Sequence, residues 1–165
     1  MQTLWSVAVG LALTVGVATQ AAAQAKADIK NAQGQSIGSA TLTETPHGVL
    51  MSATLTGAPA GTHAFHLHAV GQCAAPFTTA GGHLNPANKK HGLKSAEGAH
   101  AGDLPNITIP SGGALTFEVL APGVTMAQVL DADGAAVVLH QGVDDYATDP
   151  AGAAGDRIAC GVVMK

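Results

Sequence analysis

Alternating apolar and polar residues along the chain predict a series of short β-strands. Residues 27–31, 37–45 and 49–56 alternate as half-buried strands do, because successive side chains of a strand point to opposite faces. Turn-forming residues at positions 33–36 and 46–48 separate the three runs. The first third of the chain is therefore expected to form consecutive hairpins.

Similar runs follow in the rest of the chain, with Asp-Ala-Asp-Gly at 131–134 as a turn. The further expected strands cover residues 62–68, 107–109, 114–120, 135–140 and 157–164. Eight short strands, with no internal repeat and no interdomain linker, predict one all-β domain built as an antiparallel sandwich or barrel.

The composition agrees with an aliphatic core. Hydrophobic residues make up 47% of the chain but aromatic residues only 3%, so Val, Leu, Ile and Ala must fill the interior. The 21 glycines and 8 prolines favour turns over long helices. A net charge of -4 without a Lys/Arg block argues against binding to nucleic acid or to an acidic membrane surface.

The N-terminal segment has the pattern of a secretory signal peptide. Residues 2–25 carry no charged side chain, an apolar run covers 4–18, and Ala-x-Ala cleavage sites end at Ala23 and Ala25. We therefore expect a signal peptide over residues 1–23 and a mature domain over 24–165, located in the periplasm or secreted and free of the membrane. An uncleaved anchor is the alternative, although the apolar run is short for a bilayer span.

Export changes the interpretation of the only two cysteines, Cys73 and Cys160. In an oxidising compartment they are expected to form one disulfide, whereas in the cytosol they would be free thiols. Closing a loop of this length stabilises the fold by about 4 to 5 kcal/mol in the chain-entropy model.

His66 and His68 occupy alternate positions of the expected strand 62–68 and would project from one face. Two adjacent imidazoles suggest a metal ligand pair, but a short His-x-His also arises by chance on a solvent-facing strand. The long segment that follows, residues 69–106, decides between these interpretations. It has no sustained periodicity, yet it contains four potential ligands, so function explains it better than disorder. They are His83, His91, His100 and Asp103.

Six segments together resemble a known family. GTHAFHLH, AGGHLNP, KKHGL, AHAGDL, VVLHQGVDDY and GDRIACGVV occur in the order and approximate spacing of copper/zinc superoxide dismutases, and the secreted bacterial branch is the most similar. The resemblance covers essentially the whole mature chain. It implies an eight-stranded antiparallel Greek-key β-barrel or sandwich, immunoglobulin-like, with a long metal-binding loop and a second loop near the active site.

The resemblance also implies a site with one copper and one zinc per chain. Copper would be held by His66, His68, His83 and His140, and zinc by His83, His91, His100 and Asp103. Four imidazoles suit Cu(II), while three imidazoles and one carboxylate suit tetrahedral zinc. The shared His83 would bind both metals and pass a proton to the forming peroxide.

Two further residues match family positions around the metals. Arg157 would attract and orient the superoxide anion near copper, the alternative being an ordinary surface arginine. Asp144 would link a copper ligand to a zinc ligand, here His66 and His91.

Other residues near these motifs receive more ordinary interpretations. His63 is expected to be structural and His47 to lie on the surface. Three lysines could steer the anion but fit ordinary loop positions better; they are Lys89, Lys90 and Lys94. Ala64, where the family commonly has glycine, and the acidic Asp156 beside Arg157 are departures that could alter activity.

The sequence therefore predicts an exported superoxide dismutase that acts on superoxide for antioxidant defence in the cell envelope, as a monomer or a homodimer. The first alternative is a non-catalytic domain on the same scaffold that buffers or delivers copper. A second alternative, a structural sandwich with degenerate sites, is opposed by the complete ligand set. Retention of Arg157 favours the enzyme over copper storage.

Overall fold

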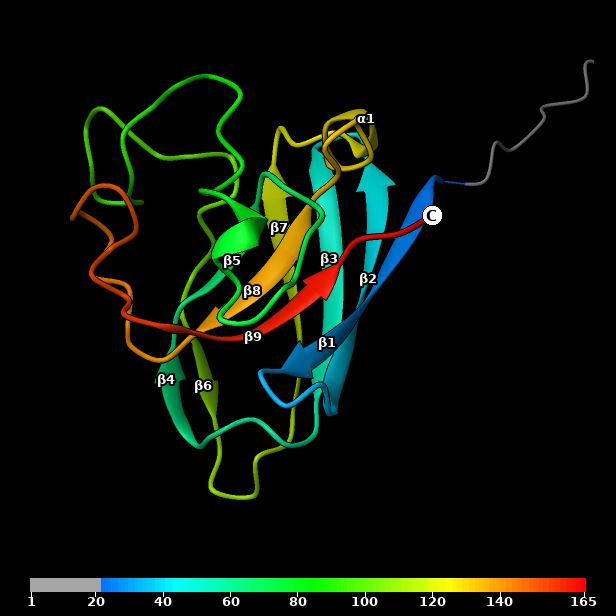
Figure 1. Ribbon diagram of the computed structural model, residues 1–165. Coiled ribbons are helices and arrows are strands. Elements are labelled where there is room, and N and C mark those ends of the chain that lie inside the picture. Colours follow the sequence, from blue (N-terminus) through cyan, green and yellow to red (C-terminus); the bar gives the residue numbers. More distant parts are fainter. Residues whose placement is uncertain (1–21) are drawn as a thin grey trace, which may run out of the picture.

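The computed structural model describes residues 22–165, so most of the predicted signal segment lies outside the described part (Figure 1). The described residues form nine strands, a 3-10 helix and one short α-helix. The strands are β1 (Gln24–Asn31), β2 (Ser36–Thr45), β3 (Gly48–Leu55), β4 (Gly61–His63), β5 (Phe65–His68), β6 (Ile107–Ile109), β7 (Leu115–Pro122), β8 (Ala136–His140) and β9 (Arg157–Val162). The helices are η1 (Thr78–Ala80) and α1 (Met126–Val129).

Seven of these strands form one curled antiparallel sheet in the order β5-β8-β9-β1-β2-β3-β7, and β4 pairs with β6. The first three strands are the predicted consecutive hairpins, while β7 returns to pair with β3 and β9 returns to pair with β1. Except for the consecutive strands β8 and β9, neighbouring strands outside these hairpins are distant in sequence. The predicted all-β fold is confirmed.

The single strand predicted for residues 62–68 is divided in two. His63 in β4 pairs with Ile107 of β6, whereas Phe65 in β5 pairs with Leu139 of β8. Between them, the fully buried Ala64 donates its N–H to Gly142 O and accepts from His140 N. The strand is interrupted because its hydrogen-bonding partner changes at Ala64, which gives nine strands instead of eight.

The core contains aliphatic side chains from all parts of the sheet, as the composition predicts. Ile29, Leu42 and Leu55 are among its fully buried members, and Phe65 packs edge-on against Phe117 with ring centroids 5.3 Å apart. The helix α1 was not predicted. It begins at a capping box in which Thr125 and Gln128 bond reciprocally.

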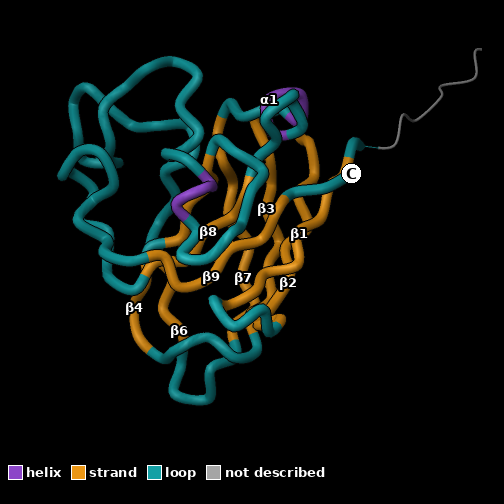
Figure 2. Tube along the Cα trace, in the orientation of Figure 1, coloured by secondary structure: helices purple, strands orange, loops and turns teal. Residues whose placement is uncertain are grey.

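Two long loops lie together on one side of the sheet, at the left of Figures 1 and 2. The first covers residues 69–106 and the second residues 141–156. The predicted disulfide is present between Cys73 and Cys160, with Cα atoms 5.6 Å apart, and it ties the first loop to β9. Within residues 22–165, no helix is long and apolar enough to span a membrane.

Candidate metal centre

The strand β5 presents two different faces to the protein. Phe65 and Leu67 belong to the hydrophobic core, while His66 and His68, on alternate positions, are fully buried on the other side. The predicted strand alternation therefore holds in this segment. Burying two imidazoles requires partners for their ring nitrogens.

Four buried histidines from β5, β8 and the first loop form a first group, with ligand atoms within 4.8 Å of one another. Its members are His66, His68, His83 and His140. The Nε2 atoms of His68 and His140 lie 3.4 Å apart. Their Nδ1 atoms point outward, 3.0 Å from Gly81 O and 3.4 Å from Gly155 O respectively. The loop carbonyls thus orient the rings so that both Nε2 atoms converge.

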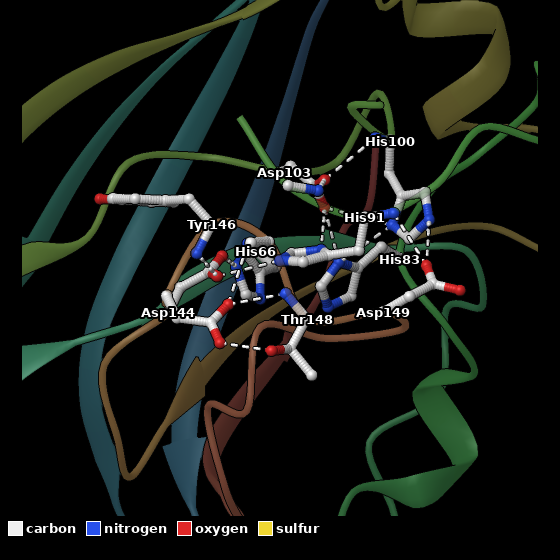
Figure 3. Close-up of polar contacts among 12 residues, drawn as sticks. His66, His83, His91, His100, Asp103, Asp144, Tyr146, Thr148 and Asp149 are labelled. Carbon is white, nitrogen blue, oxygen red and sulfur yellow. Dashed lines mark hydrogen bonds and ion pairs between the residues drawn. The ribbon is translucent and has the colours of Figure 1, made fainter. Parts of the chain in front are cut away.

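A second group, also within 4.8 Å, consists of His83, His91, His100 and Asp103 (Figure 3). Three Nδ1 atoms surround one carboxylate oxygen: Asp103 Oδ1 lies 2.7 Å from His83, 3.0 Å from His91 and 3.2 Å from His100. The other oxygen of Asp103 accepts the backbone N–H groups of Gly92 and His100. The geometry suits a tetrahedral cation with three imidazole ligands and one carboxylate ligand.

His83 belongs to both groups. Its Nδ1 lies in the second group, and its Nε2 is buried without a hydrogen-bond partner among the described residues. His66 Nδ1, in the first group, is likewise buried without a partner in the described part of the chain. An unpaired buried polar atom costs about 1–3 kcal/mol. One metal held by the first group would satisfy both atoms, and the three imidazoles and one carboxylate of the second group suit another, so the residues fit the two-metal arrangement that the sequence predicts.

Asp144 connects the two groups from the side opposite His83. Its Oδ2 lies 2.9 Å from His66 Nε2, and its Oδ1 lies 2.9 Å from His91 Nε2. All three side chains are fully buried. Asp144 thereby directs His66 Nδ1 toward the first group and His91 Nδ1 toward the second, as expected of a carboxylate that orients metal ligands.

Burial keeps three of these histidines neutral in the metal-free protein. It lowers the pKa of His68 to about 2, of His140 to about 3 and of His83 to about 4. For Asp103, burial opposes ionisation, but hydrogen bonds from His83 and from Gly92 N–H outweigh it and lower the pKa to about 2. These three imidazoles and the Asp103 carboxylate are thus in the protonation states that bind metal.

Arg157 lies at the start of β9, next to the first group. Its two Nη atoms donate to Phe77 O at 2.7 Å and to Gly81 O at 2.6 Å, and Gly81 O also lies 3.0 Å from His68 Nδ1. One carbonyl therefore contacts both the guanidinium and a member of the first group. Arg157 also lines an open cleft of about 810 Å³, together with His63 and Asp156.

The other residues singled out in the sequence lie around the two groups or on the surface. His63 is buried and its Nδ1 lies 2.9 Å from His140 O, which agrees with a structural role, and His47 is exposed in its turn. Lys90 pairs with Asp149 at 3.4 Å, and Lys94 lies over the Tyr146 ring. Two exposed residues complete the set, Lys89 and Asp156.

Sequence reasoning missed several residues that hold Asp144 and the loops. Asn106 forms two 2.9 Å hydrogen bonds with the backbone of Asp144, and Tyr146 Oη accepts from Asn106 N. Asp149 contacts the first loop at His91 N. In the sequence, Asn106 directly precedes the strand predicted for residues 107–109. Asn106 and Asp144 are 38 positions apart in the sequence, so no local pattern reveals their contact.

The fold and site define a class: an antiparallel β-sandwich protein with two buried ligand groups that share one histidine. Residues 36–163 match the model of the copper/zinc superoxide dismutase family. The chain is 43% identical to superoxide dismutase [Cu-Zn] 2 of Aquifex aeolicus, with 99% of each chain covered.

Solved structures of similar fold point to the same family. A mutant of a SOD-like protein from Bacillus subtilis has a TM-score of 0.81 at 32% identity, covering 85% of this chain and 97% of its own. The Cu/Zn superoxide dismutase of Brucella abortus has a TM-score of 0.74 at 28% identity, covering 85% and 99%.

The chain belongs to the copper/zinc superoxide dismutase family. It is an oxidoreductase that converts two superoxide anions and two protons to dioxygen and hydrogen peroxide, with copper and zinc as cofactors. The prediction from the sequence is confirmed, and the copper-buffering alternative is not favoured.

Proposed function

We propose that the first group holds copper and the second group holds zinc. Copper would be bound by His66, His68, His83 and His140, and zinc by His83, His91, His100 and Asp103. The observation that carries this assignment is His83, whose Nδ1 lies in the carboxylate-containing group while its buried Nε2 has no partner among the described residues. Four imidazoles suit copper, and three imidazoles with one carboxylate suit zinc.

His83 and Arg157 then have distinct catalytic roles. When bound, copper supplies the alternating one-electron transfers of dismutation, and zinc supplies positive charge at the other nitrogen of His83. His83 holds a proton at Nε2 during one half of the cycle and delivers it to the departing peroxide. Arg157, fixed by Phe77 O and Gly81 O, attracts the superoxide anion and orients it.

Asp144 keeps the tautomers of two ligands correct. By accepting from Nε2 of both His66 and His91, it leaves the Nδ1 atoms of these rings free to bind metal. Asn106 in turn fixes the backbone of Asp144. The two metals are thus linked on one side by a histidine and on the other by a carboxylate.

Pulse radiolysis tests these roles by following the disappearance of superoxide. Protein with one copper and one zinc per chain should remove superoxide rapidly, with a rate that falls as salt rises, and metal-free protein should not.

Arg157→Ala should lower the rate about tenfold or more and flatten its salt dependence, with bound copper unchanged. Lys26→Ala, which removes an equal charge from β1, is the matched control. Loss of copper in Arg157→Ala, or an unchanged salt dependence, would reject the steering role.

We also propose that residues 1–23 are a signal peptide and that the mature protein works in the periplasm or outside the cell, in antioxidant defence of the envelope. The uncharged apolar run and the disulfide between Cys73 and Cys160 support export. Cleavage after Ala23 fits better than cleavage after Ala25, because β1 begins at Gln24 and Ala25 is buried in the core. Mass spectrometry of the mature N-terminus tests this proposal.

We propose that the superoxide anion is the small-molecule partner of the protein, and that the mature chain binds neither nucleic acid nor a membrane. We also propose that the mature protein acts as a monomer or a homodimer. The net charge of -4 supports the exclusion of nucleic acid. Sedimentation of the mature protein distinguishes the two oligomeric states.

A further inference from the structure

Asp149 lies in the second loop and reaches three points of the first loop. Its Oδ1 accepts the backbone N–H of His91 at 2.8 Å. The same oxygen lies 4.0 Å from His100 Nε2, and Oδ2 lies 3.4 Å from Lys90 Nζ. Figure 3 shows its carboxylate directed toward His91 and His100. One side chain thus contacts the backbone of one member of the second group and faces the ring of another.

Each histidine of the second group has a different neighbour at its outward nitrogen, Nε2. The Nε2 of His91 lies 2.9 Å from Asp144, and the Nε2 of His83 faces the first group. For His100, Asp149 is the carboxylate facing Nε2, at a distance just beyond hydrogen-bond length. A carboxylate beyond a ligating imidazole fixes its tautomer and increases its basicity.

We propose that Asp149 is a second positioning carboxylate for the zinc ligands, acting on His100 through its charge and on His91 through its backbone. The inference rests on the proposed assignment of zinc to this group. Asp144 and Asp149 then belong to one loop and have separate roles, because Asp144 connects both metal groups and Asp149 serves the zinc group alone. The second loop is thereby coupled to zinc binding at two places.

Two substitutions of Asp149 distinguish an effect of its negative charge from simple attachment of the second loop to the first. In Asp149→Asn, the amide oxygen can still accept from His91 N–H, but the negative charge facing His100 and Lys90 is lost. In Asp149→Ala, both the charge and the acceptor are lost. A residue that only attaches the loop would tolerate the first change, whereas a positioning carboxylate would tolerate neither.

The experiment is a zinc competition titration against a chromogenic chelator, using copper-loaded mature protein. Asp149→Asn and Asp149→Ala should each weaken zinc binding about tenfold, with copper content unchanged. Asp145→Asn is the matched control, because it removes the same charge from the same loop while its carboxylate bonds only to Ala147 and Thr148 among the described residues. Its zinc affinity should equal that of the unmodified protein.

Two results would overturn the role of Asp149. Either Asp149→Asn binds zinc as tightly as the unmodified protein, or Asp145→Asn weakens zinc equally, which would indicate a general effect of loop charge. His100→Ala separates this failure from failure of the zinc assignment. If His100→Ala and the unmodified protein bind zinc alike, the assignment of zinc to this group is wrong.

Discussion

At the scale of single residues, Gly152 shows how closely the second loop packs on the centre. Its φ of +66° is in the left-handed region, and a Cβ there would overlap Asp144 Oδ1 and lie 2.8 Å from His91 Nε2. The loop backbone therefore covers the hydrogen bond between Asp144 and His91. Only glycine allows this close approach.

Gly152→Ala should displace Asp144 and break its bond to His91, which we expect to weaken zinc binding about tenfold. It should also destabilise the protein by about 1–3 kcal/mol through overpacking. Gly123→Ala is the control, because Gly123 has a φ of +70° and no atom within 4 Å of the position of a Cβ. Chelator competition and urea unfolding measure both effects. Equal zinc affinities in the two variants would contradict the explanation.

At the scale of elements, strands were predictable and the shape of the centre was not. The alternation in β2, β3 and β5 is local, so the chain pattern indicates both the strands and the common face of His66 and His68. The break at Ala64 depends on partners near His140, far along the chain. Convergence of the ligands was predictable only by resemblance to a family.

The first loop, residues 69–106, has little regular structure to hold it. Its links to the rest of the protein include the disulfide at Cys73, the hydrogen bonds from Arg157 to Phe77 O and Gly81 O, and the buried side chains of Leu84 and Leu104. Within the loop, the side chains of the second group converge. Removing zinc would take away the common ligand of these four side chains. The loop is therefore expected to depend on metal for its order.

Removing zinc, or replacing His100 by alanine, should make the bonds between residues 69 and 106 susceptible to protease while the sheet stays resistant. Limited proteolysis followed by mass spectrometry locates the cuts. Replacement of the exposed His47 by alanine is the control and should change nothing. Undiminished resistance of the loop after zinc loss would show that metal does not order it.

At the scale of the whole molecule, folding buries a cluster of imidazoles whose protonation would destabilise the metal-free protein. His68, His83 and His140 each have a folded-state pKa well below the ordinary histidine value of about 6.5. Between pH 6.5 and these lowered pKa values, the unfolded chain therefore binds more protons than the folded chain. The stability that these three neutral imidazoles contribute is fully present above pH 6.5 and is lost as the pH falls through this window.

Metal-free protein should accordingly show a urea midpoint that falls steadily from about pH 6.5 toward pH 4, with no loss between pH 7 and pH 8. Protein with both metals should keep its midpoint over more of this range, because metal competes with protons for the same nitrogens. Urea unfolding at each pH measures both curves. A flat curve for the metal-free protein would mean that these imidazoles are not kept neutral by burial.

The sharing of His83 between two metals is tested most directly by anomalous diffraction at the copper and zinc edges, from crystals of protein holding both metals. We predict a copper peak beside His83 Nε2 and a zinc peak about 2.0–2.1 Å from His83 Nδ1. Asp144 should span from His66 to His91 in the same map. Two peaks that do not share His83, or metals in the interchanged positions, would contradict the assignment.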